Sequence, residues 1–387
     1  MNVDIIGWSH SRFGRMDALT LEEMMRATAL DAIGDAGLEP ADIDAVFVGH
    51  FNAGFQDQGF TASLATLIHP DLRHTPTTRL ENACATGSAA IHAGADRLMA
   101  GRGRHVLVVG VEKMTHLSSA EAGAILKKAA YLPTEGDLPG GFVGMFGEIA
   151  KAYFDRHGDK GAALARIAAK NHLNGTHNPF AQMRKDLGFD FCNTVSDKNP
   201  IVIAPLRRTD CSLVSDGAAA LVLATGDAAR SASRKVRLRA RAQAADPFPM
   251  KDRDMSRFAG AERAWAQVLA EAGLALDDLD LVETHDCFTI AELIQYEAMG
   301  LTPPGQGERA LEEGWVYPGG RLPVNMSGGL KSKGHPIGAT GVSMHVVAAM
   351  QLAGEAGGMQ VPGARLAAVF NMGGAAVANY ATVLERV

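Results

Sequence analysis

The sequence predicts an α/β fold built from two related halves, each with a mixed sheet covered by helices on both faces. The first observation is an internal repeat, because residues 36–51 resemble residues 272–288, with Gly37 in the place of Gly273 and two aspartates at matching positions. The second is that short apolar strands alternate with amphipathic helices along both copies, which is typical of sheets sandwiched between helix layers.

The elements of the first half follow in order. Thr20 and Glu23 form a capping-box pattern that starts a helix, and Gly37 is placed to end it. Glycine-rich and apolar runs then predict the remaining elements: strands at 44–48, 77–82, 105–112 and 215–225, and a helix at 84–99.

The second half repeats this order with shorter connections. We expect strands at 233–241, 280–283, 365–374 and 373–385, a helix over 288–300 and another from Ala339 onward. This gives a first half at residues 1–230 and a second at 235–387. Residues 113–205 have no counterpart in the second half, so we expect an inserted loop domain with helices at 147–158 and 161–173.

The composition excludes several classes of protein. The chain has 387 residues, 47% of them apolar, and a net charge of −6, so nucleic acid is not an expected partner. Four cysteines without CxxC spacing indicate a reducing compartment. No signal peptide and no apolar stretch of about 18 residues is found, so we expect a cytoplasmic protein with no membrane association.

Cys84 lies where a predicted strand ends and a helix begins. Backbone N–H groups at a helix N-terminus stabilise a thiolate and lower the pKa of a thiol. The small residues that follow leave the sulfur accessible to a bulky substrate. The alternative is a buried structural cysteine, since free cysteine is among the most buried residue types.

His335 precedes a proline in the glycine-rich stretch 325–341. The proline disfavours helical backbone at His335 and so holds it extended before a helix, a good position for proton transfer. A structural or merely exposed histidine is the alternative interpretation.

Two further stretches follow predicted strands. THDCF places His285, Asp286 and Cys287 together, which suits acid–base chemistry better than metal binding because no second ligand cluster with zinc-like spacing is present. FNMGG ends in Gly373 and Gly374, whose backbone N–H groups could face a ligand. The duplicated fold would bring these strand ends to one junction.

This combination resembles the thiolase superfamily, and the HDCF form is similar to thiolases of the sterol-carrier-protein type. The resemblance runs through residues 145–158, 215–223 and SGGLKSKGHPIGATG at 327–341. It implies a duplicated thiolase-like fold with αβαβα layers. It also implies acyl transfer through a cysteine thioester.

The resemblance assigns roles to individual residues. Cys84 would accept the acyl group and His335 would take its proton. The amides of Cys84 and Gly373 would form one oxyanion hole, and His285 with His335 would polarise the thioester oxygen of the second substrate. Other positions match the family's contacts to the pantetheine arm of coenzyme A: Met145, Ser212 and Phe288.

One position departs from the commoner thiolases. They carry a second catalytic cysteine just before the C-terminal glycines, where this chain has Asn371, and asparagine is neither acid nor base near neutrality. Sterol-carrier-type thiolases use the HDCF cysteine instead, which is Cys287. We expect neighbouring groups and helix-terminal amides to lower the pKa of this thiol.

The resulting expectation is a thiolase that cleaves 3-oxoacyl-CoA with CoA or condenses acyl-CoA units. It needs no metal or organic cofactor, because coenzyme A is a substrate, and the family implies a homodimer or homotetramer. Two alternatives stay open. One is a thiolase-like acyltransferase that uses a non-CoA acceptor or a partner protein; the other is a catalytically silent scaffold subunit.

Overall fold

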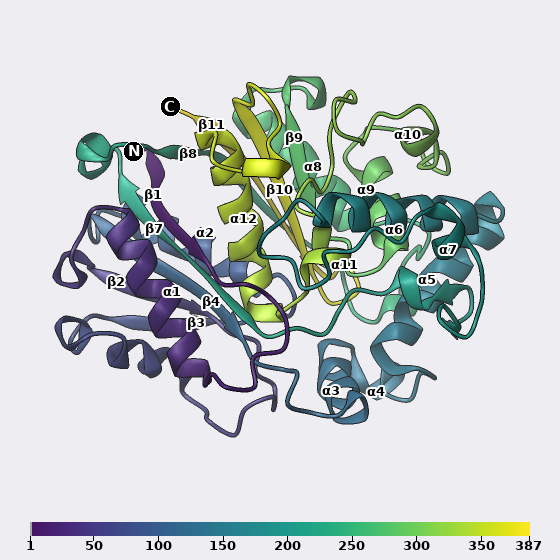
Figure 1. The fold of residues 1–387 in the computed structure, drawn as a ribbon, viewed down its shortest axis with the longest axis horizontal. Coiled ribbons are helices and arrows are strands. Elements are labelled where there is room, and N and C mark those ends of the chain that lie inside the picture. Colours follow the sequence, from purple (N-terminus) through teal and green to yellow (C-terminus); the bar gives the residue numbers. More distant parts are fainter. Residues whose placement is uncertain (1) are drawn as a thin grey trace.

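Nine strands form one continuous sheet in the computed structural model, which describes residues 2–387 (Figure 1). Their order is β3-β2-β4-β7-β1-β8-β11-β10-β9. The strands are β1 (Val3–His10), β2 (Ala45–Gly49), β3 (Thr77–Leu80), β4 (His105–Glu112), β7 (Gly217–Thr225), β8 (Val236–Ala245), β9 (Leu281–Thr284), β10 (Leu366–Gly373) and β11 (Ala378–Arg386).

The order of antiparallel and parallel strand pairs is the same on both sides of the centre of the sheet. On one side β1, β7 and β4 are antiparallel neighbours and β2 adds in parallel; on the other, β8, β11 and β10 are antiparallel and β9 adds in parallel. The α/β fold with two similar halves is therefore confirmed.

The sheets of the two halves meet along β1 and β8. β1 and β8 pair antiparallel through Asp4 with Arg237 and Ile5 with Val236, which joins the two half-sheets into one. The Arg237 Nε also donates to the buried Asp4 carboxylate at 3.0 Å. The physical reason is that β1 and β8 would otherwise be edge strands with unpaired backbone groups.

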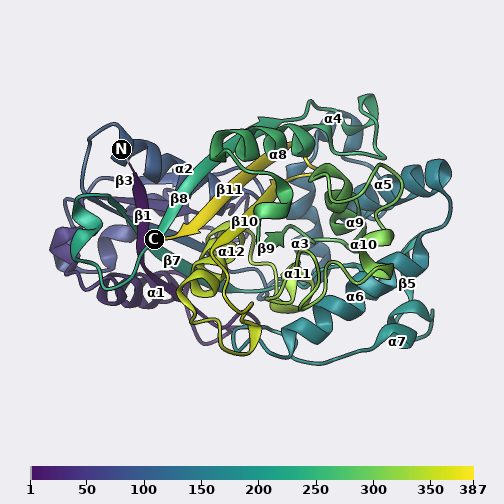
Figure 2. The ribbon, with the colours of Figure 1, turned by 90° about the horizontal axis from the view of Figure 1, so that it is seen from above.

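Helices on both faces produce five layers (Figures 1 and 2). α1 (Leu21–Asp35) covers β1 and β7 from outside, and α8 (Ala259–Ala272) covers β8 and β11. α2 (Thr86–Met99) and α12 (Ile337–Ala353) lie between the half-sheets. α12 is buried along almost its whole length, as expected of a helix in a central layer.

The two central helices approach each other closely because glycines lie at their contact. A Cβ atom on Gly87 would lie 2.6 Å from the backbone nitrogen of Val342. One on Gly341 would lie 2.3 Å from the backbone nitrogen of Ser88. Any larger side chain at either position would force α2 and α12 apart.

The halves differ most where β4 and β10 end. β10 returns to β11 through a tight turn at residues 374–377, so the predicted strand 373–385 begins only at Ala378, with Gly374 and Ala376 in the left-handed region. The insert instead separates β4 from β7. It contains α3 (Ser119–Leu126), α4 (Leu132–Glu135), α5 (Gly141–His157), α6 (Gly161–Gly175), α7 (Phe189–Asn193) and β5 (Ile201–Ile203), and β6 (Leu206–Arg207) follows it directly.

Local signals in the sequence predicted several elements well. The capping box at α1 is present, with Glu23 N–H donating to Thr20 Oγ1 at 3.1 Å and Thr20 N–H donating to the Glu23 carboxylate at 2.8 Å. The remaining helices of the second half are α9 (Thr289–Ala298), α10 (Arg309–Glu312) and α11 (Gly329–Lys333). Among residues 2–387, none of the helices combines the length and apolar character needed to cross a bilayer.

Candidate active site

Three side chains from distant parts of the chain converge in the interior. Cys84 follows β3 and lies two residues before α2, His335 lies two residues before α12, and His285 follows β9. The Cys84 sulfur and a ring nitrogen of each histidine all lie within 4.8 Å of one another, and all three residues are buried. The sequence prediction that these strand and helix ends meet is confirmed.

Burial dominates the chemistry of Cys84. It raises the pKa of the thiol to about 12, and the carboxylates of Glu112 and Glu81 add to the rise. The nearby backbone N–H groups of Gly374 and of Cys84 itself oppose the rise. The expected lowering by helix-terminal amides is therefore wrong in direction, because desolvation outweighs two amide donors. The thiol is therefore protonated at neutral pH.

His335 is held in one tautomer. Thr340 Oγ1 donates its only proton to the Pro336 carbonyl at 2.9 Å, so at 2.7 Å from His335 Nδ1 it must accept the Nδ1 proton. The Nε2 atom therefore carries a lone pair, and it is buried without a protein partner. Burial, with a contribution from Lys333, lowers the pKa of His335 to about 3, so the ring is neutral and able to accept a proton.

His285 stands edge-on to His335, with ring centroids 5.1 Å apart and planes at 80°. Its Nδ1 atom lies 2.9 Å from Asn371 Nδ2, and its Nε2 atom is buried without a partner. Burial and the neighbouring His335 hold the pKa of His285 well below its usual value. Both histidines are thus neutral.

A small apolar cavity of about 110 Å³ gives access to this group. Cys84, Cys287 and His335 lie in its wall. Apolar side chains from α3, α5 and the start of α9 form most of the remaining lining, together with the segment before β7: Met114, Leu126, Phe142, Val143, Phe288, Ile337 and residues 211–214.

Cys287 faces the same cavity as Cys84. Burial raises the pKa of Cys287 well above the usual value, and the nearby Cys84 and Asp286 raise it further. The sequence-based expectation of a lowered pKa is wrong for this thiol too, because burial removes the sulfur from water and the neighbouring Cys84 and Asp286 act in the same direction. The Cys287 thiol is therefore protonated at neutral pH.

The three residues matched to coenzyme A contacts are placed differently. Ser212 and Phe288 line the cavity, and Ser212 N–H donates to the Cys287 carbonyl at 2.9 Å. Met145 is 1% exposed in the core and does not line the cavity. It lies on α5, the helix that supplies Phe142 to the cavity wall, so the structure places it behind the wall.

Glu112 is a site residue that sequence reasoning missed. Its buried carboxylate accepts from the amides of Phe51, Asn52 and Gly338 at 2.9, 3.1 and 3.0 Å, and it lies 3.1 Å from His50 Nε2. It therefore fixes the start of α12, just after His335, to the loop that follows β2. The available signal was an acidic residue ending an otherwise apolar strand, HVLVVGVE.

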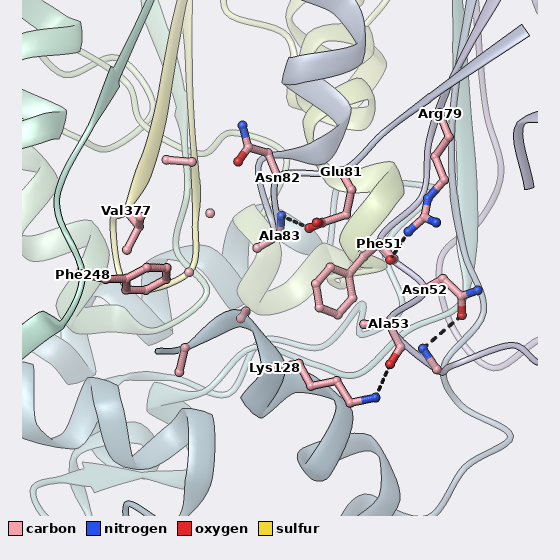
Figure 3. Close-up of a pocket in the computed structure, with 16 residues that line it drawn as sticks. Phe51, Asn52, Ala53, Arg79, Glu81, Asn82, Ala83, Lys128, Phe248 and Val377 are labelled. Carbon is pink, nitrogen blue, oxygen red and sulfur yellow. Dashed lines mark hydrogen bonds between the residues drawn. The ribbon is translucent and has the colours of Figure 1, made fainter. Parts of the chain in front are cut away.

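A larger and more open cavity of about 510 Å³ adjoins the turn that carries Cys84 (Figure 3). Asn82, Ala83, Gly373 and Gly374 border it, but Cys84 does not. Its polar side chains are already engaged: Lys128 donates to the Ala53 carbonyl, and Arg79 donates to the carbonyls of His50 and Phe51. The reactive groups therefore face the smaller cavity.

Comparison with known families decides the identity of the fold. The model described as "Thiolase, N-terminal domain" matches residues 3–227, and the one described as "Thiolase C-terminal domain-like" matches residues 242–386. The chain belongs to the thiolase family. It is an acyltransferase-type enzyme of that family, as predicted from Cys84, HDCF and GHPIGATG.

Curated relatives agree with this membership. The thiolase is 37% identical over 378 residues to an acetyl-CoA acetyltransferase of Methanothermobacter thermautotrophicus, covering 96% of both chains. It is 32% identical to sterol carrier protein 2 of Oryctolagus cuniculus, covering 97% of this chain and 71% of that one. A benzoylsuccinyl-CoA thiolase subunit of Thauera aromatica is 29% identical over 96% of this chain and 94% of that subunit.

Solved structures show the same fold at lower identity. The Ltp2–ChsH2(DUF35) aldolase superposes with a TM-score of 0.81 at 19% identity, covering 100% of this chain and 98% of that one. A monomeric SCP2-thiolase-like protein of Mycobacterium smegmatis gives a TM-score of 0.76 at 18% identity, covering 99% and 77%.

Proposed function

We propose that this thiolase cleaves 3-oxoacyl-CoA with CoA, and condenses acyl-CoA units in reverse, through an acyl thioester on Cys84. The observation that carries the proposal is the pairing of a buried thiol with a histidine whose Nε2 lone pair is fixed by Thr340. A neutral thiol and a neutral imidazole exchange a proton only as the sulfur attacks a carbonyl.

The first half of thiolysis uses these groups in sequence. The Cys84 sulfur attacks the 3-oxo carbon while its proton moves to His335 Nε2. The amides of Cys84 and Gly373, the oxyanion donors that the resemblance implies, stabilise the tetrahedral oxyanion. Breaking the bond between the second and third carbons leaves the acyl group on Cys84 and a carbanion on acetyl-CoA.

The second half regenerates the enzyme. The Cys287 thiol, which is protonated at rest, gives its proton to the carbanion and releases acetyl-CoA. His335 then returns its proton to the Cys287 thiolate and takes the proton of an incoming CoA thiol as that thiol attacks the acyl thioester on Cys84. The departing Cys84 sulfur recovers this proton from His335. Condensation runs the same steps in reverse, with Cys287 as the base.

Intact-protein mass spectrometry tests the covalent intermediate. Incubation with acetyl-CoA should add one acetyl group, and Cys84→Ala should abolish it. Cys192→Ala is the matched control, because Cys192 is equally buried but lies in α7, outside the cavity. Thiolysis across a ladder of 3-oxoacyl-CoA chain lengths, followed through loss of their absorbance, then identifies the acyl group.

A second candidate is acyl transfer to a non-CoA acceptor, or activity that depends on a partner protein. It is favoured by the likeness in fold to the Ltp2–ChsH2(DUF35) aldolase, whose name joins Ltp2 with ChsH2. The purified chain should then form the acyl enzyme but fail to thiolyse any 3-oxoacyl-CoA. A catalytically silent scaffold would form no acyl enzyme, so the same two assays separate all three possibilities.

The proposed enzyme functions in the cytoplasm as a homodimer or homotetramer and uses coenzyme A only as a substrate, with no resident cofactor. Residues 1–230 and 235–387 act as its two halves, and residues 113–205 form the inserted domain. The insert contributes Met114, Leu126, Phe142 and Val143 to the cavity wall, which supports a role in substrate selection. Light scattering on a sizing column measures the oligomeric state.

A further inference from the structure

The side chain of Asn371 occupies the position where commoner thiolases have their second catalytic cysteine. It is fully buried at the end of β10, and it contacts groups from three other elements. Its Nδ2 atom lies 3.1 Å from the Cys84 carbonyl and 2.9 Å from His285 Nδ1, and its Oδ1 atom lies 2.9 Å from Ser88 Oγ.

The orientation of this amide follows from its neighbours. The Cys84 carbonyl can only accept a hydrogen bond, so the atom facing it must be the NH₂ nitrogen. The second hydrogen of that nitrogen is directed to His285 Nδ1, and the remaining oxygen accepts from the Ser88 hydroxyl. A reversed amide would place two oxygens against each other at the Cys84 carbonyl, so the network admits one orientation.

We infer that Asn371 is a positioning residue that fixes His285 as the tautomer with its proton on Nε2, opposite to the tautomer of His335. His285 Nδ1 accepts from Asn371 and therefore holds a lone pair, which leaves the proton on Nε2. His335 Nδ1 donates to Thr340 and leaves its lone pair on Nε2. The two unpartnered Nε2 atoms are thus one donor and one acceptor.

The division of labour between the histidines follows from this assignment, and this step rests on the proposed function. His335 can accept the Cys84 proton but cannot donate until it has done so. His285 can donate to a thioester oxygen without being charged, which suits a group whose pKa is held low by burial. The same assignment disfavours metal binding by the cluster, because His285 presents no lone pair on Nε2.

Gly341 makes room for the arrangement. A Cβ atom there would lie 2.5 Å from Asn371 Oδ1 and 2.7 Å from Ser88 Oγ. The last glycine of the stretch GHPIGATG is therefore required by the asparagine network as well as by the contact between α2 and α12.

Nitrogen NMR of the chain labelled with ¹⁵N-histidine tests the inference directly. At neutral pH one active-site histidine should show an unprotonated Nδ1 with a protonated Nε2, and a second should show the reverse. His285→Asn and His335→Asn assign the two signals, since each removes one. A wild-type His285 with its proton on Nδ1 would overturn the inference, whatever the activity of the enzyme.

Asn371→Asp supplies the perturbation. The carboxylate can only accept, so His285 should take its proton on Nδ1, and the carbon–carbon step should slow by about 10²–10³, as for the loss of one oxyanion donor. Asn379→Asp is the matched control, because Asn379 is also fully buried but donates to the Ala376 carbonyl outside the site. The control should leave both tautomers and the rate unchanged.

Ser88→Ala provides a second variant if the aspartate disrupts folding. It removes the hydroxyl that donates to Asn371 Oδ1, so the amide can rotate and the His285 signal should shift part of the way toward Nδ1 protonation. An unshifted His285 signal in both variants would contradict the inference. If the NMR pattern is as expected but mass spectrometry finds no acyl group on Cys84, the tautomer assignment holds and the proposed function is rejected.

Discussion

The two central helices begin in the same way, yet they present opposite chemistry to the site. Cys84 lies two residues before α2, and His335 lies two residues before α12, the counterpart of α2 in the other half. Burial raises the pKa of the cysteine and lowers that of the histidine, so one cause makes both groups neutral. The comparison shows that the duplicated fold provides two equivalent helix starts, one with a thiol and one with an imidazole. Because desolvation keeps both groups neutral, the Cys84 proton moves to His335 only during the reaction.

The largest expected loss of activity follows from replacing Cys84, which precedes α2. Cys84→Ala should lose all acyl-enzyme formation and all thiolysis, because Cys84 is the thiol that lies within 4.8 Å of a ring nitrogen of both His285 and His335. Mass spectrometry after incubation with acetyl-CoA measures it, with Cys192→Ala retaining the adduct. An acetyl group that persists in Cys84→Ala would show that the two helix starts are not divided into nucleophile and base.

A substitution at the start of α12 should reduce the rate of acylation less than the loss of Cys84 does. His335→Ala should fold normally and slow acylation of Cys84 by about 10²–10⁴, the usual contribution of a positioned acid or base. Rapid-quench measurement of acetyl transfer tests this. His345→Asn, which changes a second buried histidine on α12 away from the cavity, should acylate at the wild-type rate. A loss below about threefold in His335→Ala would leave that histidine with a structural role only.

Cys287→Ala sharpens the comparison by separating the two half-reactions. The variant should still acetylate Cys84 and exchange that acetyl group with free CoA. Condensation and thiolysis should fall by at least about 10², because the carbon–carbon step loses its proton donor. Condensation at the wild-type rate would exclude Cys287 as the acid–base group; loss of acetylation as well would show that the steps are not divided between the two thiols.

Thr340→Val should produce a smaller change. It removes the acceptor that holds the proton on His335 Nδ1, and one neutral hydrogen bond contributes about 0.5–1.5 kcal/mol, which corresponds to roughly a 2–13-fold slower acylation. Steady-state kcat and KM values measure it, with kcat falling more than KM changes. An unchanged kcat would mean that packing alone holds the ring.

The last effect concerns the stability of the fold against pH and not the reaction rate. The folded-state pKa of His335 is about 3 and its usual value is 6.5, so the unfolded chain binds the extra proton between these values. Stability is therefore complete above about pH 6.5 and is lost as the pH falls toward 3, by at most about 1.4 kcal/mol per pH unit for this group. Urea unfolding at pH 7 and pH 5 should show a smaller acid loss in His335→Asn than in the wild type.

Much of this site could be predicted from sequence because its signals are local. The capping box at Thr20, the strand 105–112 and the proline after His335 each depend on neighbours in the chain, and the internal repeat indicated that distant strand ends would meet. The direction of the thiol pKa shifts could not be predicted. It depends on how completely the insert and α12 exclude water from Cys84 and Cys287, which no local pattern records.

The contacts of Asn371 and Glu112 were missed for a related reason. Each is an ordinary residue at the end of a strand, and its function arises from partners more than 50 residues away in the chain. A hydrogen-bond network of this kind has no spacing rule, whereas a helix cap or a pre-proline loop does.

The glycine contact between α2 and α12 has a consequence for how such a protein can diverge. Gly87 belongs to one repeat and Gly341 to the other, and a side chain at either would move the nucleophile away from its base. The outer helices and the insert can accumulate substitutions independently in each half. The contact between Gly87 and Gly341 cannot accept substitutions in this way. The two halves therefore have to evolve together, although they are copies of one unit.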